Sequence, residues 1–263
     1  MGILDAFSLA GSRAIVTGGG GGIGSAMAAA LSEAGARVAL IGRTESVNEV
    51  AARLSSSSAV AGEKGSAIAI VGDLSRPDEL ERAFRDAVTA LDGLDILIPA
   101  HGTSEGRGPS LAVSREDWQM VLEVNLISVF SLCRLAGEIM THQRSGKIVT
   151  IASMLSFFGG YNAAAYAASK GGIVQLTKSL ANEWAPFNVN VNAIAPGFVR
   201  TQLTRHVWSD PERNERLVSR IPAGRWGEPD DLRGAAVFLC SSASDYVHGA
   251  VIPVDGGHLS RSA

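Results

Sequence analysis

Short apolar runs alternate with longer amphipathic runs along most of this chain. Four short runs, at residues 14–16, 38–41, 67–71 and 95–98, fall in its first part, and the stretches after them are mostly long enough for a helix. This alternation is typical of βαβ units, in which parallel strands are buried on both faces by crossover helices. The pattern therefore predicts parallel strands joined by helices.

The same alternation continues to the end of the chain. Further strands are predicted at 147–152, 189–194 and 251–254, and helices at 25–34, 77–91, 116–140, 164–184 and 229–240. We therefore predict an α/β fold with a Rossmann-type, doubly wound parallel sheet of about seven strands flanked by helices. A length of 263 residues allows one domain to span 1–263.

Two stretches interrupt the pattern. The serine run 55–58 and residues 59–65 after it break the second predicted helix, and we expect a surface loop there. Residues 196–228 contain no clear strand and follow the carboxyl end of the sixth predicted strand, where open α/β sheets bind ligands. We expect a mobile substrate lid near 196–228, with an ordinary surface excursion as the alternative.

Charge and cysteine content narrow the range of partners. The net charge is −3, and lysines and arginines are scattered, so there is no electrostatic footprint for nucleic acid or an anionic membrane. A small, neutral-to-anionic substrate fits this surface better. Cys133 and Cys240 lie in apolar helical contexts, which indicates buried thiols and neither a disulfide nor a metal site.

The N-terminal sequence carries no targeting signal that we recognise. It lacks a basic segment followed by an apolar core, and no run approaches the roughly 18 apolar residues that span a bilayer. We expect a soluble cytoplasmic protein without a membrane partner.

A run of glycines follows the first predicted strand and leads directly into an alanine-rich helix. Gly18, Gly22 and Gly24, with Ile23 between the last two, satisfy a T-G-x-x-x-G-x-G pattern, and the run also satisfies G-x-G-x-x-G. Glycines let the backbone approach a pyrophosphate, and a helix N-terminus offers free N–H groups to it. A flexible loop is the alternative, but the position between strand and helix favours a dinucleotide site.

Cofactor choice should be decided at the end of the second strand. Arg43 and Thr44 stand there in place of the carboxylate that would bind a ribose 2′-hydroxyl, and arginine can bind a 2′-phosphate through its planar fork. We therefore expect NADP(H) to be favoured over NAD(H), the alternative being a solvated arginine beside the adenine. Asp73 and Leu74, after the third strand, are expected at the adenine, and an N-cap is an equally good role for Asp73.

A tyrosine and a lysine are spaced to share one face of a helix. Tyr166 and Lys170 are four residues apart, and Ser153 ends the fifth predicted strand. A nearby cation favours the phenolate of a tyrosine whose ordinary pKa is about 10. A Y-x-x-x-K pair alone is common by chance, but together with the glycine run and Ser153 it indicates carbonyl chemistry.

These motifs resemble those of the short-chain dehydrogenase/reductase superfamily, over about residues 9–257. The resemblance implies that Tyr166 is the general acid/base and that Lys170 lowers its pKa and binds the nicotinamide ribose. It implies that Ser153 orients the substrate carbonyl and that Asn125 anchors a proton-relay water. Without the resemblance, we would interpret Asn125 as a helix-bending residue or as a polar core residue whose hydrogen bonds are satisfied.

The resemblance also extends to the segment after the sixth strand. Pro196, Gly197 and Val199 match the part that holds the nicotinamide carboxamide, and Thr201 matches a phosphate contact. In one place the chain departs from the family: Asn-Asn-Ala-Gly after the fourth strand is Pro-Ala-His-Gly here. We interpret His101 as a hydrogen-bonded structural residue that replaces the lost amides, the alternative being a substrate or adenine contact.

Longer strings around Ser153, Asn182, Asn190 and Arg225 resemble the branch of this family that acts on sugar acids. The implied substrate is a keto-sugar acid of the 2-dehydro-3-deoxygluconate or gluconate type. The candidates for binding its carboxylate are Arg200, Arg205 and His206. Arg225 is interpreted as a structural ion pair.

Two other functions are compatible with the same motifs. The alternatives are a 3-oxoacyl-thioester reductase and a catalytically silent nucleotide-binding protein. The resemblance further implies a homotetramer that pairs the helices predicted at 116–140 and 164–184 and brings segments 251–257 together.

Overall fold

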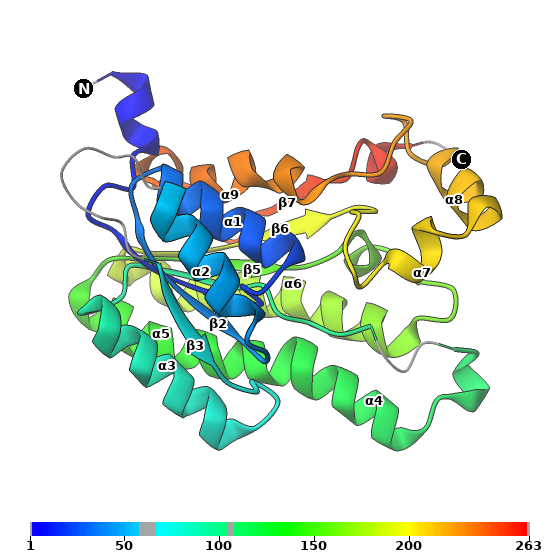
Figure 1. Cartoon of the computed structure of the whole chain (residues 1–263), viewed down its shortest axis with the longest axis horizontal. Helices are drawn as coiled ribbons and strands as arrows, with labels where there is room; N and C mark the ends of the chain where they lie inside the picture. The colour runs from blue at the N-terminus through cyan, green and yellow to red at the C-terminus, as the bar shows by residue number, and fades with distance from the viewer. Residues whose placement is uncertain (1, 58–66, 105–107, 262–263) are drawn as a thin grey trace.

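A computed structural model describes residues 2–57, 67–104 and 108–261 and contains one parallel sheet (Figure 1). Seven strands lie in the order β3-β2-β1-β4-β5-β6-β7, and every pairing is parallel. The strands are β1 Arg13–Thr17, β2 Arg37–Gly42, β3 Ile68–Val71, β4 Ile96–Pro99, β5 Gly146–Ile151, β6 Val189–Pro196 and β7 Val251–Val254. The predicted fold class is confirmed, and the order reverses between β1 and β4, where such sheets bind ligands.

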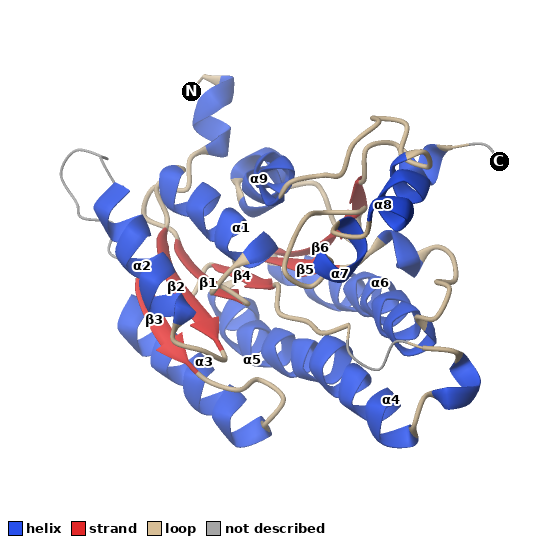
Figure 2. Ribbon diagram, turned by 45° about the vertical axis from the view of Figure 1, so that its right-hand side comes forward, coloured by secondary structure: helices blue, strands red, loops and turns tan. Residues whose placement is uncertain are grey.

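Helices cover both faces of the sheet, in two layers that Figures 1 and 2 show above and below it. The upper layer holds α1 (Gly22–Glu33), α2 (Ser46–Ser57) and α9 (Arg233–Cys240). The lower layer holds α3 (Pro77–Leu91), α4 (Arg115–Leu122), α5 (Ser128–Gln143) and α6 (Ala164–Trp184). Two short helices, α7 (Arg205–Trp208) and α8 (Pro211–Val218), lie between β6 and α9 in the sequence.

The central strands are mostly apolar because each of their faces is packed against helices. On β1, Ile15 belongs to the core beneath α3, α5 and α6, whereas Ala14 and Val16 belong to the core beneath α1, α2 and α9. All three side chains are fully buried. This double burial explains why the strands read as continuous apolar runs in the sequence.

Two predicted helices and one predicted loop differ from the observed structure. Residues 116–140 do not form one regular helix, because a π-helical turn at Glu123–Ile127 separates α4 from α5. A 3₁₀ turn, Pro229–Leu232, precedes α9. The loop predicted at 55–58 was wrong for 55–57, where α2 continues and the Ser55 hydroxyl donates to the Ala51 carbonyl. Residues 58–65 of the predicted loop lie outside the described residues.

The run Arg115–Gln143 is the one helical stretch in the described ranges with the length and composition of a membrane span, contrary to the sequence-based expectation. Its most apolar window has a mean hydropathy of 1.5, but 44% of that window is buried inside the molecule. Core helices of soluble proteins meet the same criterion, so this run is weak evidence for a membrane.

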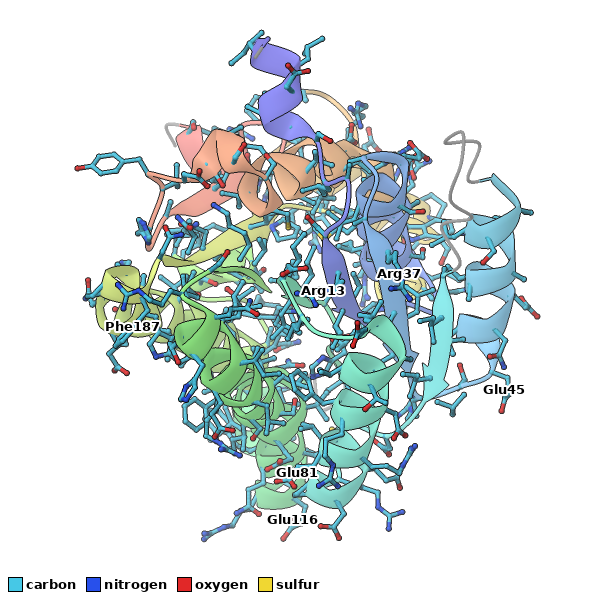
Figure 3. The ribbon with its side chains drawn as sticks, turned by 90° about the vertical axis from the view of Figure 1, so that its left-hand side faces the viewer. Arg13, Arg37, Glu45, Glu81, Glu116 and Phe187 are labelled. Carbon is cyan, nitrogen blue, oxygen red and sulfur yellow. The ribbon has the colours of Figure 1, made fainter. Side chains whose placement is uncertain are left out.

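A cleft of about 530 Å³ lies at the amino end of the sheet, and Figure 3 views the molecule from the side of Arg13 and Arg37, which line it. Arg13 binds the Asp95 carboxylate through two nitrogens, at 2.7 and 2.9 Å, and Arg37 donates to the Leu91 carbonyl. Arg13 thus joins β1 to the segment after α3 by an ion pair, and Arg37 joins β2 to the last turn of α3.

Both cysteines are free and buried, as predicted. Burial raises the pKa of each thiol, Cys133 and Cys240, to about 12. No group of potential metal ligands occurs among the residues that the structure describes.

Candidate active site

The glycine run forms a tight turn between β1 and α1, and its shape depends on the absence of side chains. A Cβ atom on Gly24 would lie 2.4 Å from the Gly18 carbonyl oxygen, and Gly18 itself has a φ of +66°. Gly22 opens α1 with a φ of +55°, and Ile23 packs against the upper core. The turn thus presents bare backbone at a helix N-terminus, a surface that suits a pyrophosphate.

The segment after β6 lies across from this turn. Gly197 donates to the Val254 carbonyl at 3.0 Å, directly after Pro196 ends the strand. A Cβ on Gly22 would touch the Thr201 methyl at 3.4 Å, so Thr201 faces the start of α1. The Val199 side chain is buried. These residues therefore lie beside the glycine turn at the carboxyl end of the sheet.

The ends of β2 and β3 carry the residues predicted to select the cofactor. Arg43 is exposed, and the Thr44 and Ser46 hydroxyls are 2.9 Å apart at the start of α2. Ser46 borders the glycine run, since a Cβ on Gly20 would lie 2.2 Å from its hydroxyl. Arg43 is thus an exposed cation on a segment that adjoins the proposed pyrophosphate site.

Asp73 forms a turn with Ser75 and does not cap a helix. Its carboxylate accepts from the Ser75 amide at 3.0 Å and from the Ser75 hydroxyl at 2.7 Å, whereas the N-cap of α3 is Arg76. The Ser75 hydroxyl and amide, with a smaller contribution from Arg43, hold the pKa of Asp73 below its ordinary value. Leu74 is buried in the core, so only its backbone is available to a nucleotide.

Ser153, Tyr166 and Lys170 come from β5 and α6, which pack together through the turn after β5. Ser153 follows the end of β5, and its hydroxyl accepts from the Leu155 amide at 3.1 Å. The Lys170 ammonium lies 5.9 Å from the centre of the Tyr166 ring and donates to the Ile151 carbonyl at 2.7 Å. Burial lowers the pKa of Lys170 to about 8. A buried cation beside a half-buried phenol favours the phenolate.

Asn125 lies within the π-helical turn and is completely buried. Its side-chain oxygen accepts from the Thr103 amide at 2.8 Å, and its amide nitrogen donates to the Thr103 carbonyl at 2.9 Å. The same nitrogen donates to the Ser169 hydroxyl at 3.2 Å, and Ser169 in turn donates to the Tyr166 carbonyl at 2.7 Å. Asn125 therefore ties the chain after β4 to the helix that carries Tyr166 and Lys170.

His101 is hydrogen bonded on both sides, in agreement with the structural interpretation of its sequence position. Its Nδ1 lies 2.6 Å from the Thr17 hydroxyl, and its Nε2 lies 2.7 Å from the Ser128 hydroxyl. Burial and the nearby charge of Lys170 lower the pKa of His101 to about 4. The imidazole is therefore neutral at physiological pH.

The proposed lid begins and ends at neighbouring points. Val199 and Gly227 form an isolated parallel bridge. The Arg200 amide donates to the Gly227 carbonyl at 2.9 Å, and the Gly227 amide donates to the Phe198 carbonyl at 2.8 Å. Figures 1 and 2 both place α7 and α8 at the end of the molecule toward which β6 points. Residues 200–226 thus form an excursion with a closed base.

The three predicted carboxylate-binding residues differ in how free they are. Arg200 pairs with Glu228 at 3.6 Å, and its guanidinium lies 6.0 Å from the centre of the Trp208 ring. Arg205 and His206 are exposed on α7, and neither makes an ion pair with any residue in the described ranges. Arg205 and His206 are therefore the two candidates that make no ion pair within the described part of the chain.

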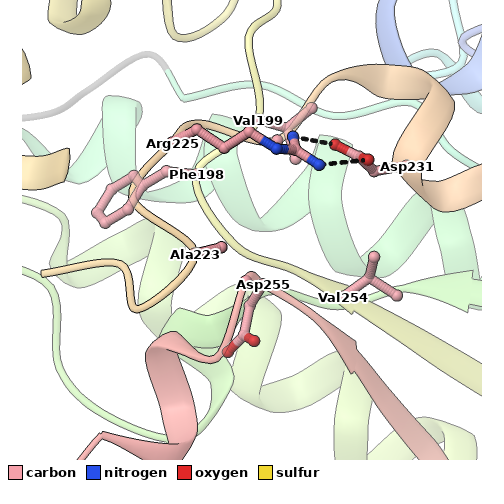
Figure 4. Close-up of a pocket in the computed structure, with 9 residues that line it drawn as sticks. Phe198, Val199, Ala223, Arg225, Asp231, Val254 and Asp255 are labelled. Carbon is pink, nitrogen blue, oxygen red and sulfur yellow. Dashed lines mark hydrogen bonds and ion pairs between the residues drawn. The ribbon is translucent and has the colours of Figure 1, made fainter.

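A pocket of about 200 Å³ lies between the lid base and the chain after β7 (Figure 4). On one side Arg225 donates to both oxygens of Asp231, at 2.7 and 2.9 Å, which confirms its interpretation as a structural ion pair. This contact lowers the pKa of Asp231 to about 2. Asp255 lies on the other side of the pocket, away from that pair.

Sequence reasoning missed an aromatic cluster beside this pocket. His258 lies between Phe158, at 5.8 Å, and Phe198, at 5.4 Å, measured between ring centres. Phe158 comes from the loop after Ser153, and Phe198 precedes Val199. The cluster therefore joins the chain ends beyond β5, β6 and β7, and a signal was present in the sequence, because His258 directly follows the last predicted strand and its glycine turn.

A doubly wound sheet with a glycine turn at its first crossover, and with Ser153 and a buried Lys170 beside a half-buried Tyr166, defines a short-chain dehydrogenase/reductase. The profile of a family described as Enoyl-(Acyl carrier protein) reductase matches residues 18–258. The chain belongs to the short-chain dehydrogenase/reductase family and is an NAD(P)-dependent oxidoreductase that acts on CH–OH groups.

Similar proteins of this family have been named for sugar acids. The 2-dehydro-3-deoxy-D-gluconate 5-dehydrogenase of Bacillus subtilis is 46% identical over 260 residues, which cover 98% of each chain. A structure of a candidate NAD(P)-dependent gluconate 5-dehydrogenase from Beutenbergia cavernae, with NADP at low occupancy, has a TM-score of 0.92 at 47% identity and covers 97% of this chain and 100% of its own. The gluconate 5-dehydrogenase of Burkholderia cenocepacia, in complex with NADP and tartrate, has a TM-score of 0.91 at 37% identity and covers 99% and 100%.

Proposed function

We propose that this protein transfers a hydride between NADP(H) and a carbonyl or secondary alcohol of a keto-sugar acid of the 2-dehydro-3-deoxygluconate or gluconate type. The observation that carries the reaction class is the buried Lys170 ammonium beside the Tyr166 ring, at the same sheet edge as the glycine turn. The substrate class is supported by the names of relatives that match this chain over nearly its whole length.

Four side chains would carry the chemistry. Tyr166 exchanges a proton with the substrate oxygen, and Lys170 holds a positive charge close to its ring, which stabilises the phenolate. Ser153 donates its hydroxyl to the same oxygen and orients it. Asn125 fixes the turn beside Lys170 and anchors a proton-relay water. A bound nicotinamide would give a hydride to the carbonyl carbon in reduction and take one from the alcohol carbon in oxidation.

The nucleotide would be held by the glycine turn and by the segment after β6. The pyrophosphate would bind at Gly18, Gly22, Ile23 and Gly24, and Thr201 would contact a phosphate. The nicotinamide carboxamide would be held by Pro196, Gly197 and Val199, and the nicotinamide ribose by Lys170. The adenine would lie against Asp73 and the backbone of Leu74. The fit is supported by the side-chain-free turn, since a Cβ on Gly24 would collide with Gly18.

We propose NADP(H) over NAD(H) because of the residues directly after β2. Arg43 is exposed and can present two N–H groups to a 2′-phosphate, and residues 42–44 hold no carboxylate that would bind a 2′-hydroxyl. Structures of relatives with bound NADP support the same choice.

The substrate carboxylate would be bound under a lid near 196–228. Arg205 and His206 are the free candidates, whereas Glu228 already neutralises Arg200. Arg205→Gln should raise KM for a sugar acid at least severalfold and leave kcat within about twofold, because the contact lies away from the reacting carbon. Arg213→Gln, on α8 and paired with Asp210, serves as the matched control. An equal rise of KM in both variants would contradict the role of Arg205.

The substrate test is a parallel assay with NADPH and NADH. The compounds are 2-dehydro-3-deoxygluconate, gluconate, 4-deoxy-5-ketouronate and acetoacetyl thioesters, with the oxidised cofactors used for the alcohols. We expect the highest kcat/KM for a sugar acid. If the thioester gives much the highest value and the sugar acids are inert, the protein is a 3-oxoacyl-thioester reductase. If NADPH binds but nothing turns over, it is a silent nucleotide-binding protein.

We further propose that the enzyme is a cytoplasmic homotetramer. Trp118, Ile127 and Phe130 leave 37%, 47% and 45% of their surface exposed along α4, the π-helical turn and α5, which supports pairing of this face with a second copy. Burial of the same face between subunits would account for the apolar character of Arg115–Gln143 without a membrane.

A further inference from the structure

The hydrogen bonds around His101 have one consistent direction. The Ser128 hydroxyl donates to the Val124 carbonyl at 2.8 Å, so it accepts from His101 Nε2–H at 2.7 Å. Nδ1 of the neutral ring is then an acceptor, and it receives the Thr17 hydroxyl at 2.6 Å. His101 therefore connects Thr17 to Ser128 through a single tautomer.

The Thr17 end of this chain of hydrogen bonds lies at the glycine turn. Thr17 is the last residue of β1 and is completely buried. The next residue is Gly18, and a Cβ atom there would lie 2.9 Å from the His101 amide nitrogen. A change in the position of His101 would therefore be transmitted to the backbone of the turn.

The Ser128 end lies at the π-helical turn. Val124, whose carbonyl accepts the hydrogen bond from the Ser128 hydroxyl, directly precedes Asn125 in the π-helical turn Glu123–Ile127. Asn125 closes a ring of contacts, because it holds both the amide and the carbonyl of Thr103. The π-helical turn is thus joined to the chain after β4 twice, through His101 and through Asn125.

We propose that His101 is a positioning residue that couples the nucleotide turn to the π-helical turn that carries Asn125. Its Nδ1 side fixes the glycine turn through Thr17, and its Nε2 side fixes Asn125 through Ser128 and Val124. The proposal rests on the proposed roles of the glycine turn and Asn125. It goes beyond the replacement of lost strand contacts, because it gives the two ring nitrogens separate effects on binding and on turnover.

Two amide substitutions separate the two sides. An asparagine amide reaches about as far as Nδ1 of histidine, and a glutamine amide about as far as Nε2. His101→Asn should therefore keep the Thr17 contact and lose the Ser128 contact, and His101→Gln should do the reverse. Ser128→Ala removes one partner directly. Ser131→Ala is its matched control, because Ser131 donates in the same way to the Ile127 carbonyl, at 3.0 Å, on the same helix.

Three measurements read the two effects. NADPH titration by fluorescence should show a Kd raised at least fivefold in His101→Gln and within twofold of wild type in His101→Asn. In His101→Asn and Ser128→Ala, kcat should fall about tenfold with whichever carbonyl compound the wild type reduces best, and the pKa in the pH–rate profile should move. Hydrogen exchange of the peptide that covers Glu123–Ile127 should rise in the same two variants and not in Ser131→Ala.

The proposal is overturned if the two His101 variants change Kd and kcat alike, or if Ser128→Ala behaves as Ser131→Ala in the exchange experiment. Lower stability with unchanged Kd and pH profile would also overturn it, since that result indicates a purely structural histidine. The nucleotide titration and the exchange measurement need no substrate. They therefore decide the proposal even if the proposed substrate class is wrong.

Discussion

Replacing Lys170 with methionine should stabilise the protein while it abolishes turnover. Only 5% of Lys170 is exposed, and burial lowers its pKa from 10.5 to about 8. At pH 7 the amine is charged in the folded and unfolded states, so folding must move a charge out of water. The two pKa values correspond to a cost of about 3 kcal/mol.

Methionine has a similar length and carries no charge, so this cost disappears in the variant. The variant also loses the hydrogen bond from Lys170 to the Ile151 carbonyl. This loss destabilises the folded state by about 1–2 kcal/mol. We therefore expect the free energy of unfolding at pH 7 to increase by about 1–2 kcal/mol. Loss of turnover follows from the proposed role of Lys170 beside Tyr166.

The advantage of the variant should depend on pH with a definite sign. Between about pH 8 and 10.5 the unfolded wild type holds a proton on Lys170 that the folded wild type has lost. The unfolding free energy of the wild type therefore rises with pH in this window, relative to the variant. The difference between the two proteins should be largest below pH 8 and should vanish or reverse above about 10.5.

Urea unfolding of both proteins without nucleotide, at one protein concentration and at several pH values from 7 to 10, measures this difference. Lys178→Met is the matched control, because Lys178 is exposed on the same helix. It should change the unfolding free energy by less than about 0.5 kcal/mol. A Lys170→Met protein that unfolds at lower urea than wild type at pH 7, or shows the same pH slope, would refute the reasoning.

Three further outcomes are expected. Tyr166→Phe should lower kcat by about 10²–10⁴-fold and leave NADPH binding nearly intact. Tyr246→Phe, at a fully exposed tyrosine, should change neither. If Tyr166→Phe keeps more than about a tenth of the wild-type rate, its hydroxyl is not the general acid/base. Arg43→Ala should lower kcat/KM for NADPH by about tenfold to a hundredfold and leave kcat/KM for NADH almost unchanged. The control is Arg85→Ala, at an exposed arginine on α3. Equal losses with both cofactors would show that Arg43 does not discriminate between them. Light scattering at micromolar concentration should give the mass of four 27.3 kDa chains, and a monomeric mass would contradict the proposed assembly.

The sheet and most of its helices could be predicted because local patterns determine them. Strands buried on both faces are mostly apolar, and long helices keep one apolar stripe, so Ala14–Val16 and the run that became α6 are visible in the sequence. The π-helical turn was missed because an apolar stripe continues through it. The α8 helix was also missed, although Asp210 caps it and Pro211 opens it, signals that the sequence displays.

The residues of the candidate site were recognisable by spacing only where they share an element. Tyr166 and Lys170 lie on one helix, and the glycines lie on one turn. His101 is 84 residues from Thr17 and 27 from Ser128, so no local pattern reveals that its ring joins them. Likewise, the pairing of Arg200 with Glu228 depends on how segment 200–226 returns to the sheet. Contacts of this kind follow from the fold, and the linear pattern contains no trace of them.

The closed base of segment 200–226 has a consequence for how this enzyme can diversify. Because Val199 and Gly227 already lie together, the segment between them can change in length without moving β6 or α9. Each doubling of such a segment costs only about 0.6 kcal/mol in closure entropy. On the proposed function, a longer or shorter segment would alter the surroundings of Arg205 and His206 and would leave β6, α9 and the helix that carries Tyr166 and Lys170 in place.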